Sequence, residues 1–566
     1  MTFADLQLVP TPAAYLKAAR TIDAGEVEGL RPLRIAVLAT FTAEFLRPYL
    51  TVEGAARGFA FTTWFGPWGQ IEEQVLDAAS ALYAGQPDAV VILARLEDLA
   101  PAAAERLGGA IAGLRERTSK PVFVANFVEP LHRAAGLAGD AVEQSRANEA
   151  LAEACRAHAD VHVLDLARTA LEHGLNAWTD PKLFALARIP FSVTAQIAVA
   201  KRLARTIRAA FTPSAKVLAL DLDNTLWGGV LGEDGLGGIA LGDEYPGSVF
   251  KAWQKYLRAL KDRGVLLAIA SKNNEADVME LFAKHRDMVL RREDFAAVRI
   301  NWQEKSVQLG ELATELNLGL DAFVFLDDSA FEREEVRQHL PTVRVIDFPS
   351  SPLGLIATVE DSELFDRLAL SAEDRQRADI YRQQTVRVAA EKTASSSGEF
   401  LQSLQLTATI GAVDGETLPR VAQLLAKTNQ FNLTTRRHSA AEIAAMIEGG
   451  AVALWLRLAD RFGDHGLTGV AIAVGDGAEW RVDTFLLSCR VIGRGAEMAL
   501  LAQLENAVRA RGAGALTGEY LATAKNGLVA DFYPKQDFLP CGEGRWRLDL
   551  STHQIAPPPH IAIQTT

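Results

Sequence analysis

The sequence contains few cysteines, no block of basic residues and no long apolar run. Its only cysteines are Cys155, Cys489 and Cys541, too few for a disulfide framework or a cysteine-rich zinc site and typical of a reducing compartment. Aspartate and glutamate (71) outnumber lysine and arginine (58), and the resulting net charge of −13 argues against a nucleic-acid partner. The absence of an uninterrupted apolar run of about 18 residues excludes a membrane-spanning helix.

The N-terminal stretch also lacks the basic start and apolar core of a secretory signal, so we expect a cytoplasmic protein. Hydrophobic residues make up 49% of the 566 residues and charged residues 23%, which is the composition of a globular protein. A chain of this length predicts three or four domains. Because the protein is acidic, an acidic partner requires a locally basic docking patch.

The strongest chemical signal lies in the middle of the chain, from Lys216 to Gly235. Val217 to Leu220 is a short apolar run typical of a buried strand, and Asp221, Asp223 and Thr225 follow it at alternate positions. The carboxyl end of a parallel strand is where open α/β sheets bind ligands. Two neighbouring carboxylates repel each other, and a hard cation such as Mg²⁺ relieves that repulsion. The alternative is an acidic solvated loop, but the strand, the spacing and the following glycines favour a metal site.

A second strand pattern, Val265 to Ala270, ends in Ser271 and is followed by Asn273 and the start of a helix pattern. A hydroxyl at this position holds a phosphate oxygen together with neighbouring backbone amides. The alternative is that Ser271 serves only as a helix N-cap. Ser271 follows the acidic stretch at Asp221 along the chain and, like it, stands at a strand end, and this order favours the phosphate role.

Two further candidate motifs follow in the same part of the chain. Lys305 opens a helix pattern, and a buried strand pattern from Ala322 to Leu326 ends in Asp327 and Asp328. A cation offsets the charge of a phosphoryl group, and carboxylates complete a magnesium site. By itself Lys305 would be a solvated surface residue; its position between the other motifs favours a functional role. The residues do not decide which of Asp327 and Asp328 contacts the metal directly.

These four elements closely resemble motifs I to IV of the haloacid dehalogenase superfamily, and the string DLDNTLWGGVLGEDG resembles its FkbH subfamily. The resemblance implies a magnesium-dependent phosphatase core in which Asp221 attacks phosphorus and Asp223 transfers protons. It implies further that Asp221, the main-chain carbonyl of Asp223, Asp327 and Asp328 hold the Mg²⁺, with Thr225 and Asn273 among the cofactor-binding residues. The segment Leu226 to Gly264 is too short to form a large cap domain.

The first third of the chain alternates strand and helix patterns, which predicts a parallel sheet covered on both faces. The predicted strands are Ile35–Ala39, Ala89–Ala94, Val122–Asn126 and Val161–Leu164, and the predicted helical segments include Gln70–Leu82 and Ala141–Ala157. This region resembles the SGNH-like domain of long FkbH-type proteins, notably from Phe65 to Ile92.

An active SGNH hydrolase would place a serine after the first strand and a histidine near the domain's end. Here the first strand leads into Ala39-Thr40-Phe41-Thr42, and the late Asp180 has no histidine after it. We therefore expect a catalytically inactive domain with a structural or docking role. Asn126 and Asp165 lie at strand ends and either line a residual pocket or are ordinary polar loop residues; the second interpretation is favoured.

The last part of the chain is predicted to be mixed α/β, with strands at Leu404–Gly411, Val452–Leu458, Leu467–Val474 and Trp480–Leu487. A loop containing Arg490, Gly493, Arg494 and Gly495 then precedes a helix pattern. Glycines before a helix N-terminus let backbone amides bind a pyrophosphate. The loop resembles the one with which GNAT-type acyltransferases hold the phosphopantetheine and pyrophosphate of acyl-CoA. The tail from Ala556 is expected to be disordered.

Cys489 lies between a strand end and a helix start, beside Arg490 and near Arg494. Positive potential increases the thiolate fraction of a cysteine, so a covalent role is favoured over packing as a small hydrophobe. His465, in a glycine-rich string, is either a general base near a nucleophile or a surface turn residue, and the residues favour neither.

The predicted fold class is therefore α/β with three domains: an SGNH-like domain (1–211), a HAD-like Rossmann core without a large cap (212–360) and a GNAT-like α+β domain (401–566), the last preceded by a connecting helix and linker (361–400). The resemblance to long FkbH-like proteins implies conversion of 1,3-bisphosphoglycerate to a glyceryl thioester on an acyl carrier protein, with loss of phosphate. Two alternatives stay open: a magnesium-dependent phosphatase acting on another phosphorylated metabolite, and a non-catalytic scaffold, which the intact motifs disfavour.

Overall fold

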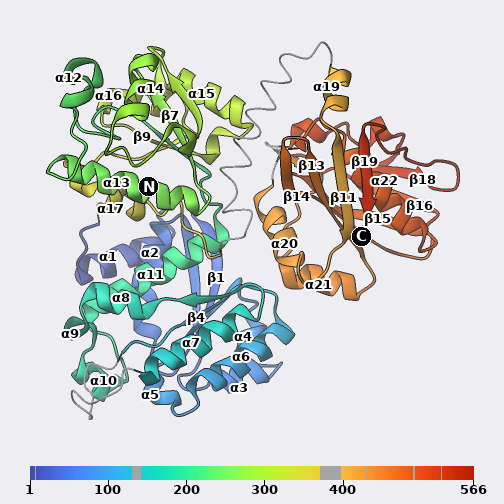
Figure 1. The fold of residues 1–566 in the computed structure, drawn as a ribbon. Helices are drawn as coiled ribbons and strands as arrows, with labels where there is room; N and C mark the ends of the chain where they lie inside the picture. The colour runs from blue at the N-terminus through green and yellow to red at the C-terminus, as the bar shows by residue number, and fades with distance from the viewer. Residues whose placement is uncertain (7, 130–141, 370–396, 429, 489–490, 524–525) are drawn as a thin grey trace. The chain divides into compact units, whose positions relative to one another are not determined.

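The structure is a computed structural model that describes residues 1–566 except 7, 130–141, 370–396, 429, 489–490 and 524–525. The chain divides into two compact units: the first is 1–212 with 439–442, and the second comprises 213–438 and 443–566. Each of the three sheets is built from one continuous part of the chain, shown in blue to teal, green to yellow, and orange to red (Figure 1). Among the described residues, no helix is both long and apolar enough to cross a membrane.

The N-terminal part contains a five-stranded parallel sheet with strand order β2-β1-β3-β4-β5. Helices α3, α6 and α7 bury their apolar side chains against one face, whereas α2 and α11 contact strands β2 and β5. The elements are α1 (Pro12–Asp23), β1 (Arg31–Ala39), α2 (Arg47–Ala55), β2 (Phe59–Phe65), α3 (Ile71–Leu76), α4 (Ala81–Ala84), β3 (Ala89–Leu93), α5 (Leu96–Leu99), α6 (Ala103–Arg117), β4 (Val122–Ala125), α7 (Val142–Arg156), β5 (Val161–Leu164), α8 (Leu166–His173), α9 (Leu175–Trp178), α10 (Pro181–Ala187) and α11 (Val193–Phe211).

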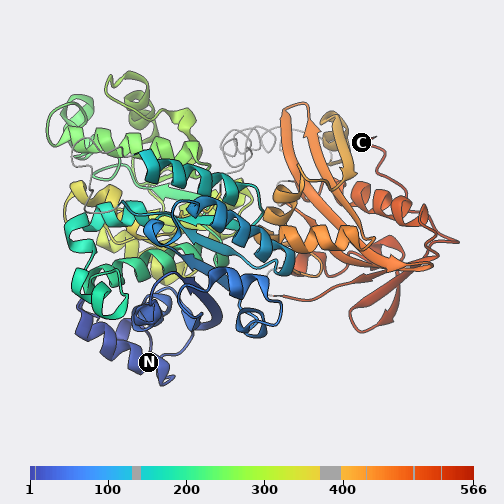
Figure 2. The same ribbon diagram turned by 90° about the horizontal axis from the view of Figure 1, so that it is seen from below.

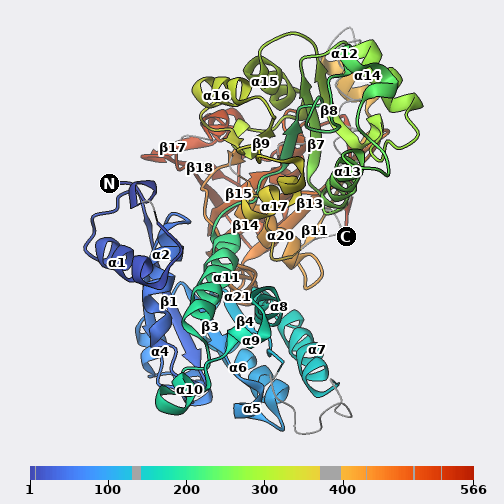
Figure 3. The same ribbon diagram turned by 90° about the vertical axis from the view of Figure 1, so that its left-hand side faces the viewer.

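The central part contains a second five-stranded parallel sheet, with order β10-β9-β6-β7-β8. Alternate residues of β6 face opposite sides: Leu218 and Leu220 pack with α13, α14 and α17, while Val217 and Ala219 pack with α15 and α16. Figure 3 shows α15 beside α16. The elements are β6 (Val217–Leu220), α12 (Leu231–Gly238), α13 (Gly247–Asp262), β7 (Leu266–Ser271), α14 (Glu275–Lys284), β8 (Phe295–Ile300), α15 (Lys305–Leu316), β9 (Phe323–Leu326), α16 (Ala330–His339), β10 (Arg344–Val345) and α17 (Leu355–Asp361).

The C-terminal part contains a mixed sheet with order β17-β18-β16-β15-β14-β13-β11-β19, to which β12 adds by pairing with β15. Helix α22 packs on one face, and α20 and α21 pack on the other. Figure 2 shows the strands of this sheet (orange) running side by side. The elements are α19 (Ser397–Ser403), β11 (Leu406–Ala412), α20 (Leu418–Lys427), β12 (Phe431–Asn432), α21 (Ala440–Glu448), β13 (Val452–Asp460), β14 (Gly463–Asp476), β15 (Glu479–Leu487), α22 (Ala496–Arg509), β16 (Ala515–Glu519), β17 (Leu539–Gly542), β18 (Arg545–Asp549) and β19 (Ile561–Thr565).

The structure corrects three expectations about these elements. The helix predicted over 70–82 is two short helices, because the Asp77 side chain accepts a hydrogen bond from the Ala79 amide and forms a turn between them. Strands β2 and β8 were missing from the predicted sheets; both are edge strands. The tail from Ala556 is not disordered, since β19 pairs in parallel with β11. Most of the predicted connecting segment, 370–396, lies outside the described residues.

Candidate functional site

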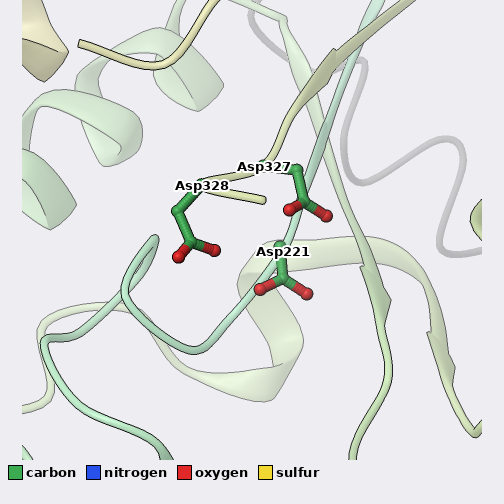
Figure 4. Close-up of side chains that lie close together, drawn as sticks. All are labelled: Asp221, Asp327 and Asp328. Atoms are coloured by element: carbon green, nitrogen blue, oxygen red, sulfur yellow. The ribbon is translucent and has the colours of Figure 1, made fainter. Parts of the chain in front are cut away.

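Three carboxylates meet at the carboxyl edge of the central sheet. Asp221 directly follows β6, and Asp327 and Asp328 directly follow the neighbouring strand β9. One oxygen of each lies within 4.8 Å of the oxygens of the other two, and Figure 4 shows the three side chains converging. Asp221 and Asp327 are 7% and 1% exposed. The sequence thus brings together, on adjacent parallel strands, acids that are more than a hundred residues apart in the chain.

Lys305 places a buried cation against this cluster. It is the first residue of α15 and is only 2% exposed. Its Nζ donates to Asp221 Oδ1 at 2.5 Å and to the Ala270 carbonyl at 2.7 Å, and lies 3.0 Å from Asp327 Oδ2. Burial disfavours the ammonium, but the two carboxylates raise the pKa of Lys305 above its ordinary value. Lys305 therefore stays charged and is not a solvated surface residue.

The cluster carries more negative charge than Lys305 balances. Burial, with the nearby Asp221 carboxylate, raises the pKa of Asp327 to about 7 and raises the pKa of Asp328 as well. Three converging carboxylates, of which Asp327 and Asp328 have raised pKa values, are the donor set of a hard divalent cation that takes oxygen ligands, such as Mg²⁺. The residues present therefore fit the predicted metal.

The Asp223 side chain stands apart from this cluster and is held by three donors. Its Oδ1 accepts from Trp227 Nε1 at 2.9 Å and from the Leu231 amide at 3.1 Å, and its Oδ2 accepts from Asn273 Nδ2 at 2.9 Å. Burial raises the pKa of Asp223, and the charge of Asp221 adds to the effect. A carboxyl group that is fixed in place and has a raised pKa suits proton transfer.

The remaining predicted positions of the central domain lie in the same loops. Ser271 is the last residue of β7 and is 1% exposed. Ser271 is not the N-cap of the following helix, because Asn274 caps α14 through its side chain. Thr225, fully buried, accepts from the Asp328 amide at 3.2 Å. Asn273 contacts Asp223 rather than the acidic cluster.

Two supporting residues were not predicted from the sequence. Trp227, fully buried, supplies the indole donor to Asp223. Arg333 donates from Nη1 to the carbonyls of Asp327 and Asp328, at 2.8 Å each, and so fixes the loop that carries both acids. Trp227 lies four residues after Asp223, a spacing that allows a local contact, whereas nothing in the sequence indicates the partners of Arg333.

The loop before α22 has the glycine geometry expected of it, but its arginine points inward. Gly493 and Gly495 have φ values of 79° and 85°, and Gly495 is the N-cap of α22. Arg494 Nη1 lies 2.8 Å from His465 Nε2 and 3.3 Å from Asp460 Oδ2. The structure thus gives the Arg494 side chain, 9% exposed, protein partners. Cys489 and Arg490 lie outside the described residues.

His465 is not a surface turn residue. It lies on β14, is fully buried, and places Nε2 3.1 Å from Asp460 Oδ2. The C-terminal segment also reaches this region: His560 Nε2 lies 2.8 Å from the carbonyl of Arg494, and a Cβ on Gly495 would meet His560 and Pro558 at 3.2–3.3 Å. A side chain at position 495 would therefore have to displace His560 and Pro558 slightly, and its φ of 85° also favours glycine.

In the N-terminal domain, the polar residues at the strand ends serve the local structure. Asn126 Nδ2 donates to Asp165 Oδ1 at 2.8 Å, and Asp165 caps α8. Thr40 Oγ1 donates to Asp98, and Asp180 caps α10. These contacts agree with the interpretation of Asn126 and Asp165 as structural loop residues.

No family model and no curated protein sequence matches the chain. The N-terminal region is similar to the crystal structure of the N-terminal part of a Bacteroides fragilis protein that contains a phosphatase domain and is complexed with Mg; the identity is 27%, the TM-score 0.54, and the match covers 65% of this chain and 100% of that one.

The C-terminal region aligns with the ribosomal-protein-S18-alanine N-acetyltransferase of Escherichia coli (17% identity, TM-score 0.21, 25% of this chain and 94% of that one). It also aligns with an N-acetyltransferase of Staphylococcus aureus (17% identity, TM-score 0.20, 25% of this chain and 99% of that one). The site geometry and the likeness to the phosphatase domain confirm the prediction of a multi-domain α/β enzyme with a phosphatase-type centre.

Proposed function

We propose that the central domain is a magnesium-dependent phosphoryl-transfer centre of the haloacid dehalogenase type. The observation that carries this proposal is the buried cluster of Asp221, Asp327, Asp328 and Lys305 at the carboxyl edge of a parallel sheet. The Mg in the similar Bacteroides fragilis structure supports the choice of metal. Asp221, Asp327 and Asp328 would hold the ion, which supplies charge neutralisation between the nucleophile and the phosphoryl oxygens when bound.

The geometry supports separate tasks for the two acids of the first motif. Lys305 holds Oδ1 of Asp221, so Oδ2 is the atom available to attack phosphorus and form an aspartyl-phosphate. Asp223 has a raised pKa and is positioned by Trp227, Leu231 and Asn273 to protonate the leaving oxygen and then to take a proton from water. The Ser271 hydroxyl, at the end of β7, would hold a phosphoryl oxygen.

At the level of substrate, we propose that the acyl phosphate 1,3-bisphosphoglycerate is converted to a glyceryl thioester and passed to an acyl carrier protein, with release of phosphate. Two observations support a substrate that is shared with a carrier protein. Between the first and second motifs, a segment that the structure describes throughout, the chain forms only α12 and α13, which is too little for a large cap domain. A further sheet follows in the C-terminal part of the chain, with a glycine loop at the start of α22. The Cys489 sulfur would bond to the acyl carbon as the bond from that carbon to the acyl phosphate breaks, which releases one phosphate. Asp221 would attack phosphorus of the C3 phosphate ester, and hydrolysis of the aspartyl-phosphate would release the second phosphate.

The test combines phosphate release and mass spectrometry on the full chain incubated with Mg²⁺ and 1,3-bisphosphoglycerate. Asp221→Asn should lower release of the C3 ester phosphate at least about 1,000-fold, because the nucleophile is lost, and should leave a 3-phosphoglyceryl group in place of the glyceryl group. Asp262→Asn, a largely exposed carboxylate of the same domain, should have no effect. A glyceryl adduct on the Cys489 peptide that moves to a carrier protein would support the transferase.

Two outcomes would reject parts of the proposal. Release of the C3 ester phosphate at the wild-type rate by Asp221→Asn would exclude the central site as its source. Release without any adduct or transfer, in a wild-type protein with an intact site, would leave a phosphatase acting on a different phosphorylated metabolite.

A further inference from the structure

The solvent side of α13 carries positive charge without ion-pair partners. Lys255 and Arg258 on the helix and Arg263, its C-cap residue, are exposed and spread along about 12 Å of helix length. Among the residues that the structure describes, none of the three forms an ion pair. A single acid lies between them, Asp262, at 3.9 Å from Lys261. This side of the helix is therefore positive, in a chain whose net charge is −13.

The segment after α14, residues 285–294, lies along α13. Gln254 Oε1 accepts hydrogen bonds from two backbone amides of the segment, at 2.9 and 3.1 Å, and Lys261 Nζ donates to Asp294 Oδ1 at 2.5 Å. Burial disfavours the ionised form of Asp294, but the hydrogen bond from Lys261 and the nearby charges of Lys261 and Arg258 keep its pKa below its ordinary value. The end of this segment is therefore close to the cations of α13.

Helix α14 and the end of this segment enclose an open hollow of about 480 Å³. It is lined by three residues of α14 and three of the segment: Met279, Phe282, Ala283, Arg291, Arg292 and Glu293. Arg291 Nη1 donates to the Phe282 carbonyl at 3.0 Å, and Arg292 Nη1 donates to the Phe295 carbonyl at 3.1 Å. Because a guanidinium has five N–H donors, these bonds position both groups and leave donors for a ligand. The hollow thus combines apolar side chains with two cations.

Most acids of α13 and of residues 279–294 are held by lysines, which leaves the arginines in surplus. The pairs are Glu280 with Lys284 at 2.6 Å, Asp287 with Lys251 at 2.9 Å and Asp294 with Lys261 at 2.5 Å. Arg286 also approaches Asp287, at 3.1 Å, but is 92% exposed. The remaining cations, which we call the basic face, are Lys255, Arg258, Arg263, Arg286, Arg291 and Arg292. They outnumber the remaining acids, Asp262 and Glu293, and such a local surplus of positive charge attracts a negatively charged partner.

An acidic protein fits the basic face better than a small anion or a nucleic acid does. A small anion would use only the hollow, whereas the cations of α13 do not line it and extend the positive surface beyond it. A nucleic acid would match the cations but would leave the apolar side chains of Met279 and Ala283 unfilled and would meet the carboxylate of Glu293. Protein interfaces combine an apolar centre with a charged rim, and complementary charge guides the partners together.

The basic face lies away from the mouth of the magnesium site. Arg263 precedes the start of β7, whereas Ser271 is the last residue of that strand, so about 20 Å of strand separates the two ends. On its inner side, Phe282 packs edge-on against Trp227, with 6.2 Å between ring centroids, and Trp227 donates to Asp223. A partner on the basic face would therefore be close to the site without covering its acids. That position suits a partner that presents its reactive group on a flexible arm.

We propose that the basic face docks an acidic carrier protein, with an apolar side chain of the carrier in the hollow between α14 and Arg291; this proposal rests on the proposed function. The negative side chains of the carrier pair with Lys255, Arg258 and Arg263. The phosphopantetheine arm of the carrier stays outside this contact and is free to reach the substrate.

The experiment measures the Kd of the full chain for a fluorescently labelled, acidic acyl carrier protein in its apo form, by fluorescence anisotropy. The apo form lacks the phosphopantetheine arm, so its binding reports docking alone. We expect the wild-type Kd to weaken at least about fivefold when NaCl is raised from about 50 to 200 mM, because salt screens exposed charges. A single-stranded RNA of about 20 nucleotides is the second probe, and we expect it to bind more weakly than the carrier.

Two variants separate the charge of the basic face from the shape of the hollow. Arg258→Glu combined with Arg263→Glu should raise the Kd for the carrier about 10-fold or more. Ala283→Gln fills the hollow without changing charge and should raise it about fivefold. The matched control, Lys17→Glu with Arg20→Glu, reverses two exposed cations of α1 and should bind as the wild type does. Phosphate release from 1,3-bisphosphoglycerate should be unchanged in all of them.

Folding is checked by the thermal transition, and glutamine replaces glutamate at positions 258 and 263 if the charge reversal does not fold. A wild-type protein that releases phosphate but does not bind the carrier, or folded variants with the wild-type Kd, would overturn the docking role and leave the phosphatase intact. Equal weakening by the α1 control would overturn it too, since only net charge would matter. Tighter binding of the RNA, lost in the same variants, would assign the basic face to nucleic acid instead. Carrier binding in the expected pattern by a protein that releases no phosphate would reject the proposed function alone.

Discussion

Lys305 separates two carboxylates that would otherwise face each other in the protein interior. Its ammonium contacts Asp221 and Asp327 and is 2% exposed. Loss of one partner of a buried ion pair leaves uncompensated charge, which costs about 3–5 kcal/mol. The same lysine therefore contributes to stability and to the charge balance of the site.

We expect Lys305→Met to reduce the free energy of unfolding of the metal-free protein by about 3 kcal/mol or more, measured by urea denaturation in the presence of EDTA. Mg²⁺ should recover part of the loss, since it neutralises the same carboxylates. Lys284→Met, which removes a largely exposed lysine from α14, should change stability by less than about 0.5 kcal/mol. Equal effects of the two substitutions would contradict the buried ion-pair network.

The ionisation of Asp327 predicts how metal binding depends on pH. Its pKa of about 7 without metal means that a proton occupies a metal-binding oxygen below neutrality. The unfolded chain has a lower carboxyl pKa, so the metal-free protein should lose stability as pH rises from about 4 through 7. Mg²⁺ binding requires the ionised form, so its affinity should increase over the same range.

We therefore expect Mg²⁺ to raise the Tm more at pH 8 than at pH 6, and calorimetry should detect proton release on binding at pH 6.5. An Mg²⁺ affinity that does not change between pH 6 and 8 would show that Asp327 is ionised throughout and would contradict this prediction.

At the scale of elements, the sequence predicts the central parallel sheet well and its edges poorly. Central strands such as β6 and β9 are continuous apolar runs, and each is followed by acids that mark its end. Strand β2 alternates buried and exposed residues, and β19 pairs only through the distant β11. Pairing partners are set by tertiary structure, so a short edge strand carries little local signal.

The site shows the same contrast between residues that a local sequence pattern reveals and residues that only the fold reveals. The acids and Lys305 are found from motifs, whereas Arg333 contacts carbonyl groups that only the fold brings near. The position of His465 on a buried strand was also not evident from its glycine-rich neighbourhood.

Strand β19 allows a test of whether a single edge strand contributes to the stability of the folded core. Ile561 is 6% exposed in the core beneath α22, whereas Gln564 on the same strand is exposed. Ile561→Ala should lower stability by about 2 kcal/mol or more through the loss of buried surface and the cavity left behind, measured by chemical denaturation. Gln564→Ala should be nearly neutral. If both are neutral, β19 is not part of the folded core.

At the scale of the whole molecule, each sheet takes its strands from one continuous stretch of chain, and no strand is exchanged between stretches among the described residues. Fragments that keep these stretches intact should fold. We expect residues 1–369 alone to bind Mg²⁺ and release phosphate, and residues 397–566 alone to unfold cooperatively. Circular dichroism and the phosphate assay check both, and a fragment 1–369 without cooperative unfolding would show that the central sheet depends on the C-terminal part.

The order β10-β9-β6-β7-β8 has a consequence for the growing chain on the ribosome. Strands β6, β7 and β8 are synthesised in sequence and pair side by side, but the other edge of β6 stays open until residues 323–326 have been made. An open edge in the middle of a future sheet is a template for pairing with another nascent chain. The interval between the synthesis of β8 and that of β9 is thus a period in which the nascent chain is exposed to misassembly and in which a chaperone would be of use.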